Sequence, residues 1–210
     1  MEEIKFEKGE VEWDPDDNKK FQPKTKFNPN TRNDRFHNSI KDKIVKTIFT
    51  DGGSKIIYEK DKTWYVGAWG FYDEDEDFMK GEAEEPATNN QMELKAVIEA
   101  IKYLNKIGVD KEEWVKINLD SNYVRLGILF WVKKWVENDW KRKLKDGTEE
   151  EVKNIDLWKE LYQLSSERKI YYNRVPGHAG IDGNEKIDTF CSDLIKDKMS
   201  ELGLSDKKKK

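Results

Sequence analysis

The chain has 210 residues, with 39 lysines and arginines against 43 aspartates and glutamates, so its formal net charge is −4. This balance argues against a protein that binds nucleic acid through a uniformly basic surface. The single cysteine excludes an intrachain disulfide, and no apolar run approaches the roughly 18 residues that span a bilayer. We therefore expect a soluble, intracellular monomer without membrane contact, cytoplasmic with the nucleus as the alternative.

Composition divides the chain into three regions. Residues 1–43 hold three of the five prolines and show no period of 2 or 3.6 residues. They predict a polar N-terminal extension that is disordered or loosely docked, with a small accessory binding element as the alternative. Residues 44–200 carry the periodic apolar pattern of a folded domain, and residues 201–210 form a basic C-terminal tail.

The first half of that domain predicts three strands and a helix. Alternating apolar residues place strands over 45–51 and 64–72, and an edge strand over 78–82. Five consecutive acids at 73–77 lie between the last two, and their mutual repulsion favours a solvated turn over a metal site. A helix over 90–106 follows, because Leu94, Val97, Ile101 and Leu104 recur at three- and four-residue steps.

The second half alternates helices with strands. A strand over 114–120 is followed by one or two helices over 123–141 and a helix over 155–167. A strand over 169–175, a loop over 176–183 and a helix over 184–199 complete the order. This order predicts an α/β fold in which a five-stranded mixed sheet, an antiparallel meander plus parallel strands, is flanked by helices.

Four acids lie where a purely structural role is hard to assign. Asp51 interrupts an apolar strand before two glycines, and Asp120 ends another strand. Glu93 and Asp188 lie in the first turns of predicted helices. Each has an ordinary interpretation, since acids near helix starts favour the helix dipole and acids at strand ends belong to turns.

The surroundings of these acids change that interpretation. In order and spacing, four motifs resemble those of type 1 ribonuclease H: FTDGGS (49–54), TNNQMEL (88–94), DSNYV (120–124) and PGHAGIDGNEKID (176–188). The resemblance implies a ribonuclease H-like fold and cleavage of the RNA strand in RNA/DNA hybrids by the domain at 44–200. It implies that Asp51, Glu93, Asp120 and Asp188 are catalytic metal ligands, and that His178 is a mobile catalytic histidine.

The residue types are consistent with that implication. Four converging carboxylates cannot all ionise cheaply without a cation, and oxygen-only ligands favour Mg²⁺, with Mn²⁺ as the alternative. Two ions in one site can clamp a scissile phosphate, leaving 5′-phosphate and 3′-hydroxyl ends. His178 is suited to proton exchange or product release because imidazole titrates near neutral pH, and the alternative is a loop histidine without a partner.

Residues 131–145 predict a surface for the DNA strand. They carry six cations and two anions, a local net charge of +4. The segment resembles the basic protrusion of the family, so we expect Tyr123, Trp131 and Trp135 to line the DNA groove, with Lys133 and Lys134 meeting phosphates. The alternative is a core-facing tryptophan stripe beneath a solvated basic face.

Amide and hydroxyl side chains supply further predicted contacts. Asn89 and Asn122 match family positions that read 2′-hydroxyls. Thr88 and Asn154 match a pocket for a DNA phosphate, although Pro86 stands where a cation is sometimes found. The alternative for Asn154 is a cap of the following helix. The segment 53–59 departs from the family's RNA-contacting loop, so those contacts cannot be transferred.

We therefore expect a metal-dependent endonuclease acting on RNA/DNA hybrids. The alternatives are a nuclease of the same fold that cleaves DNA, and a non-catalytic hybrid-binding protein. A replication or reverse-transcription partner is not identified by the sequence. Residues 73–85 carry a net charge of −7, so the remainder of the chain carries +3 and the acidic total no longer argues against a nucleic-acid substrate.

Overall fold

The computed structural model describes residues 36–59, 61–144 and 146–204. Most of the predicted N-terminal extension and the end of the basic tail therefore lie outside the described residues. The chain divides into two units, residues 1–39 and 40–210, and the elements below all belong to the second. Among the described residues, no helix combines the length and apolarity that a membrane span requires.

A five-stranded mixed sheet forms the centre of this unit, and it confirms the predicted fold class. Its order is β3-β2-β1-β4-β7, with β1 antiparallel to β2, β2 antiparallel to β3, and β1, β4 and β7 mutually parallel. The strands are β1 (Ile44–Tyr58), β2 (Thr63–Asp73), β3 (Phe78–Glu84), β4 (Trp114–Leu119) and β7 (Ile170–Arg174).

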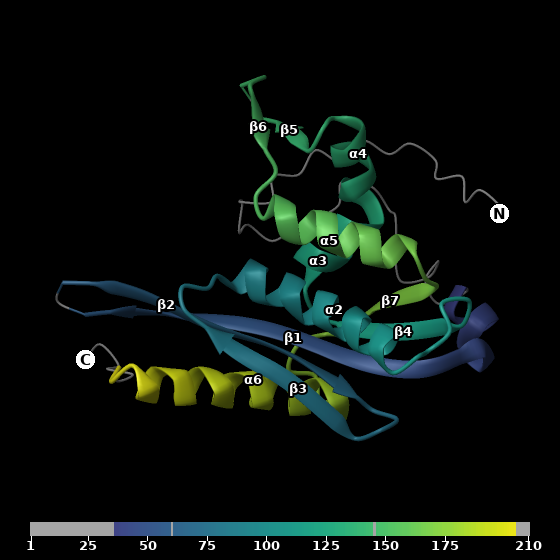
Figure 1. Cartoon of the computed structure of the whole chain (residues 1–210), viewed down its shortest axis with the longest axis horizontal. Helices are drawn as coiled ribbons and strands as arrows, with labels where there is room; N and C mark the ends of the chain where they lie inside the picture. The colour runs from purple at the N-terminus through teal and green to yellow at the C-terminus, as the bar shows by residue number, and fades with distance from the viewer. Residues whose placement is uncertain (1–35, 60, 145, 205–210) are drawn as a thin grey trace. The chain divides into compact units, whose positions relative to one another are not determined.

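Helices cover both faces of the sheet (Figure 1). On one face lie α2 (Asn89–Lys106) and α5 (Ile155–Ser166), and on the other lies α6 (Asp182–Glu201). Between β4 and α5 the chain forms α3 (Asn122–Leu126), a π-helical turn (Gly127–Trp131), α4 (Val132–Glu137) and a small hairpin of β5 (Lys141–Lys143) and β6 (Glu149–Glu151). A short 3₁₀ helix, Lys41–Lys43, precedes β1.

Two elements differ from expectation. β1 does not end near Asp51 but continues to Tyr58, because the β-forming residues at 56–58 pair with β2 as far as Tyr58↔Thr63. The β5–β6 hairpin was not predicted, because its strands have three residues each and no apolar alternation. The segment at 123–141 is accordingly two short helices joined by a π-helical turn, with the hairpin after them.

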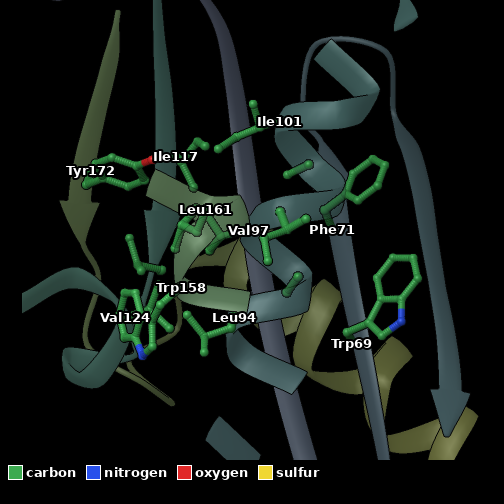
Figure 2. Packing of buried hydrophobic residues seen from close by; sticks show 14 of the residues in the cluster. Trp69, Phe71, Leu94, Val97, Ile101, Ile117, Val124, Trp158, Leu161 and Tyr172 are labelled. Carbon is green, nitrogen blue, oxygen red and sulfur yellow. The ribbon is translucent and has the colours of Figure 1, made fainter. Parts of the chain in front are cut away.

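Two apolar cores hold the layers together. In the larger, shown in Figure 2, Leu94, Val97 and Ile101 of α2 pack between the sheet and Leu161 of α5. In the smaller, α6 packs its own apolar side chains onto the opposite sheet face, and its members include Phe49, Ile187, Cys191 and Ile195. Burying each large apolar side chain contributes about 1.5–3 kcal/mol, so both helices are firmly placed.

Candidate active site

Asp51 lies on β1 at the point where α2 touches the strand. A Cβ added at the neighbouring Gly52 would lie 2.3 Å from the backbone nitrogen of Glu93, so only glycine permits this approach. Helix α2 starts just before, at a capping box in which Thr88 accepts from the backbone N–H of Gln91 and Gln91 accepts from that of Thr88. The close packing brings Glu93 beside Asp51.

Asp120 and Asp188 reach the same place from β4 and α6. The parallel register pairs Thr50 with Leu119, so Asp120 follows β4 next to the position of Asp51 on β1. On α6, one turn beyond Asp188, the thiol of Cys191 donates to the backbone carbonyl of Asp51 over 3.6 Å. The strand end, the helix and β1 thus converge on one site.

The pKa values of three of these carboxylates are raised at this site. Burial, followed by the charges of Asp120 and Asp188, raises the pKa of Asp51 to about 6. Burial also raises the pKa of Glu93 to about 7, with further contributions from Asp120 and Asp51. The pKa of Asp120 is raised by burial and by the charge of Asp188. The negative charges of Asp51, Asp120 and Asp188 therefore disfavour ionisation of neighbouring carboxylates.

This donor set fits a divalent cation. All four side chains are carboxylates, and hard oxygen ligands of this kind suit Mg²⁺ or Mn²⁺ better than zinc. The raised pKa values show that burial and mutual repulsion work against the ionised cluster. A bound cation would remove that repulsion, and Asp51, Glu93, Asp120 and Asp188 are the residues that would hold it.

Two neighbouring side chains hold Glu93 in position. The amide of Asn89 donates to one carboxylate oxygen over 2.8 Å, and the hydroxyl of Ser121 donates to the other. Both hydrogen bonds lower the pKa of Glu93 and so oppose the effect of burial. Ser121 also caps α3 by accepting from the N–H of Val124, which links this carboxylate to the element that follows Asp120.

His178 stands at the rim of the site. Its side chain is 82% exposed, its backbone is left-handed with φ of 52°, and its Nδ1 lies 3.5 Å from a carboxylate oxygen of Asp188. A Cβ at the preceding Gly177 would lie 2.9 Å from an oxygen of Asp120, so this loop passes close to the carboxylates. The imidazole is therefore accessible to solvent while adjacent to the site.

Glu185 belongs to this region, although the sequence did not single it out. Potential ligand atoms of His178, Glu185 and Asp188 all lie within 4.8 Å of one another. Glu185 also accepts from the backbone N–H of Gly180 over 3.1 Å and so ties the His178 loop to α6. The available signal was its position three residues before Asp188, on the same helical face.

The predicted DNA-groove aromatics form one cluster. The ring centroids of Tyr123 and Trp131 lie 6.3 Å apart, and those of Trp131 and Trp135 lie 5.9 Å apart. Trp135 is only 8% exposed and packs edge-on against Trp158, so its ring lies mainly in the core. Tyr123 and Trp131 are half-buried, and the hydroxyl of Tyr123 accepts hydrogen bonds from Trp158 and Asn154.

The remaining predicted contact residues lie at the starts of helices or on α4. Asn154 precedes α5 with a left-handed backbone and makes no side-chain cap, so the capping alternative is wrong. Asn122 is exposed at the start of α3, and Lys133 and Lys134 are exposed on α4. Thr88 is exposed at the start of α2, beside Asn89.

The basic protrusion is partly neutralised by the hairpin. The register faces Lys141 with Glu151, Arg142 with Glu150 and Lys143 with Glu149. Arg142 and Glu150 form an ion pair. The cations of β5 are therefore offset by the acids of β6, whereas Lys133 and Lys134, the lysines predicted to meet phosphates, do not lie in this ladder.

Comparison with known proteins gives one consistent family. A family model described as RNase H matches residues 43–196. A ribonuclease H of Zymomonas mobilis subsp. mobilis is 39% identical over 158 residues, covering 74% of this chain and 90% of its own. A ribonuclease H of Nitrosospira multiformis is 40% identical over 151 residues, covering 70% and 87%.

Two solved structures share the fold. The crystal structure of LC9-RNase H1, described as a type 1 RNase H with the type 2 active-site motif, aligns with a TM-score of 0.55 at 22% identity, covering 72% of this chain and 73% of its own. A foamy viral protease-reverse transcriptase in complex with dsDNA aligns with a TM-score of 0.58 at 20% identity, covering 72% and 94%.

Proposed function

The chain belongs to the ribonuclease H family, whose activity is hydrolysis of the RNA strand in RNA/DNA hybrids, and we propose that it performs this reaction with two Mg²⁺ ions. The products would carry 5′-phosphate and 3′-hydroxyl ends, and Mn²⁺ would substitute for Mg²⁺. The observation that carries the proposal is the convergence of four carboxylates from β1, β4, α2 and α6, where burial and neighbouring negative charges raise the pKa values of Asp51, Glu93 and Asp120.

Each residue has a defined part in this proposal. Asp51, Glu93, Asp120 and Asp188 bind the metal, and Asn89 with Ser121 fixes the orientation of Glu93. When bound, such ions lower the pKa of the attacking water and stabilise the charge that develops on the departing 3′ oxygen. His178, exposed and 3.5 Å from Asp188, exchanges protons with solvent at the rim and assists product release.

Substrate contacts follow from the placement of the polar and aromatic side chains. Asn89 and Asn122 read 2′-hydroxyls of the RNA strand. Tyr123 and Trp131 contact DNA sugars, supported from the core by Trp135, while Lys133 and Lys134 meet phosphates. Thr88 and Asn154 bind a DNA phosphate.

The test is a cleavage assay on labelled hybrid, duplex DNA and duplex RNA, each with Mg²⁺, Mn²⁺ or chelator. We expect cleavage of the hybrid's RNA strand with either metal and none with chelator. Asp120→Asn should abolish it, while Asp197→Asn, an exposed acid further along α6, should leave the rate unchanged. Cleavage of duplex DNA alone would indicate a DNA nuclease, and hybrid binding without cleavage would indicate a binding protein.

A further inference from the structure

The outer side of β3 is an open edge of the sheet. The strand order places β3 at one end of the sheet (Figure 1), and in the part of the chain that the structure describes no strand pairs with its outer side. Backbone N–H and C=O groups along such an edge are a template for pairing with another strand. Phe78 and Met79, which are 42% and 37% exposed, add apolar surface beside this edge.

The connections at both ends of β3 turn away from this edge. After the strand, the backbone N–H of Ala87 donates to the carbonyl of Tyr65 over 2.7 Å, so the chain returns toward β2. Before the strand, the backbone N–H of Glu74 donates to the carbonyl of Thr47 on β1 over 3.1 Å. Neither connection therefore runs along the open edge, which leaves the whole length of β3 accessible.

The charges of β3 are arranged symmetrically about Gly81. Lys80 and Glu82 flank this glycine, and both side chains are exposed. When β3 pairs antiparallel with the β3 of a second copy, a two-fold axis passes beside one residue, which faces its own counterpart. With Gly81 at the axis, Lys80 of each copy lies opposite Glu82 of the other. The interface then holds two pairs of opposite charges.

Charges on an edge strand commonly prevent self-pairing, and neighbouring registers of β3 show that effect. An axis at Lys80 places two lysines opposite each other, and an axis at Glu82 places two glutamates opposite each other. Gly81 is also the middle residue of the strand, so an axis there pairs all seven residues and sets the exposed Met79 opposite Ala83. This register is therefore favoured by charge, by length and by apolar contact.

Lys80 and Glu82 are also the charges of β3 that are most available to a second copy. Glu84 forms an ion pair with Lys95 of α2. Within the described part of the chain, Glu82 forms no ion pair. Lys80 forms only a long one, of 3.8 Å, with Glu99. A second copy would thus meet charges that the chain itself leaves largely uncompensated.

We propose that the chain forms a weak symmetric dimer in which the β3 edges of two copies pair antiparallel about Gly81, which joins the two sheets into one. Asp51, Gly70 and Gly81 are successive cross-strand partners, so the axis lies in register with the candidate active site. Five strand spacings of about 4.8 Å place the Asp51 residues of the two copies roughly 24 Å apart. A single edge buries little surface, so the monomer expected from the sequence is the form at low concentration.

The test exchanges the charges on either side of Gly81. Lys80→Glu and Glu82→Lys each place like charges opposite each other twice, so each should weaken the dimer about tenfold or more. The double variant Lys80→Glu/Glu82→Lys restores opposite charges and should dimerise like the wild type. An equimolar mixture of the two single variants should also dimerise, because each copy then meets opposite charges on the other.

Sedimentation velocity of the full-length chain, over about a hundredfold range of concentration, measures each association. Lys102→Glu is the matched control, because Lys102 also pairs with Glu99 but lies where α2 meets Glu160 of α5, away from the edge. This variant should dimerise like the wild type. Melting temperatures of dilute samples show whether the variants fold. If Lys80→Glu melts early, the comparison of Glu82→Lys with Glu82→Gln carries the same argument.

Three outcomes would overturn the inference. A wild type that stays monomeric over the whole range shows that the edge does not pair. A dimer that survives both single charge reversals forms through another surface. Single variants that dissociate but do not associate in the mixture exclude the Gly81 register. Hybrid cleavage is assayed separately at low concentration, so failure of the dimer and failure of the proposed function are distinguishable.

Discussion

Arg142 on β5 and Glu150 on β6 face each other across their hairpin, and the guanidinium donates from Nε over 2.7 Å, and from Nη2, to the same carboxylate oxygen. Lysines flank Arg142 and acids flank Glu150, so the hairpin is a ladder of opposite charges. The acids of β6 would therefore compete with the phosphates of a bound nucleic acid for the cations of β5.

Glu150→Gln should strengthen hybrid binding. Freeing Arg142 adds up to one phosphate contact, so the slope of log K against log salt should become more negative by up to about 0.9. Fluorescence anisotropy on hybrid in chelator, over a range of salt concentrations, measures both quantities. Glu112→Gln is the control, because Glu112 is also an exposed acid paired with a lysine but lies before β4. An unchanged slope for Glu150→Gln would show that Arg142 does not reach phosphate.

Asp51→Asn should abolish cleavage yet stabilise the metal-free protein. Burial and the neighbouring carboxylates raise the pKa of Asp51 to about 6 from 3.8, so its charge destabilises the fold at neutral pH. After a discount for the partial exposure of Asp51, we expect the substitution to increase the free energy of unfolding by roughly 2 kcal/mol. Thermal melting in chelator, with hybrid cleavage assayed in parallel, measures both effects.

The pH dependence of this stabilisation has a defined sign. Above pH 6 the carboxylate is ionised in both the folded and unfolded states, and the destabilisation is fully present. As the pH falls from 6 to below 4, the folded protein takes up its proton first and the destabilisation disappears. The difference in melting temperature should therefore be largest near pH 8 and smallest near pH 4. A difference that grows on acidification would contradict this account.

Gly52→Ala should damage both stability and activity. Its Cβ would lie 2.3 Å from the backbone of α2, which cannot shift without moving Glu93. We expect a loss of about 3 kcal/mol of unfolding free energy and a large fall in cleavage rate. Gly53→Ala is the matched control, because its nearest neighbour would be a side-chain methyl of Ile195 at 3.7 Å. Urea denaturation of both variants measures the contrast, and equal losses would disprove the packing argument.

His178→Ala should lower kcat about a hundredfold with little change in KM, if the imidazole acts in proton exchange. The residue is 82% exposed, so its removal should leave the melting temperature unchanged. His37→Ala is the natural comparison, since the chain has only these two histidines. Steady-state kinetics of hybrid cleavage by both variants measures this effect. An unchanged kcat for His178→Ala would show that His178 has no role in the mechanism.

Much of the fold could be predicted because apolar residues recur at regular intervals along its main helices and strands. The spacing of apolar residues in α2 and their alternation in β1 and β2 indicate which side chains are buried. The motifs around the four carboxylates indicate the order in which these carboxylates occur along the chain. The placement of Asp51 beside Glu93 could not be calculated from the sequence, since it depends on backbone packing at Gly52. The sequence contains Gly52, but it does not show that the backbone of α2 packs against this residue.

Other features could not be predicted for identifiable reasons. The β5–β6 hairpin is specified by charge pairs across strands rather than by apolar alternation. The extension of β1 had a signal in Ile56, Ile57 and Tyr58, but the two preceding glycines favoured a loop. Trp135 shares a helical face with Trp131, and periodicity alone does not distinguish a core-facing ring from a groove-facing one.

The position of Asp188 on α6 has a consequence for how the protein is made. Three of the carboxylates lie on elements completed by residue 120, but the fourth belongs to the last helix of the described chain. A nascent chain still being translated can pair β1, β2 and β4 well before that helix emerges from the ribosome. Such a chain would have an incomplete metal site, so nuclease activity would appear only when synthesis of the domain is nearly finished.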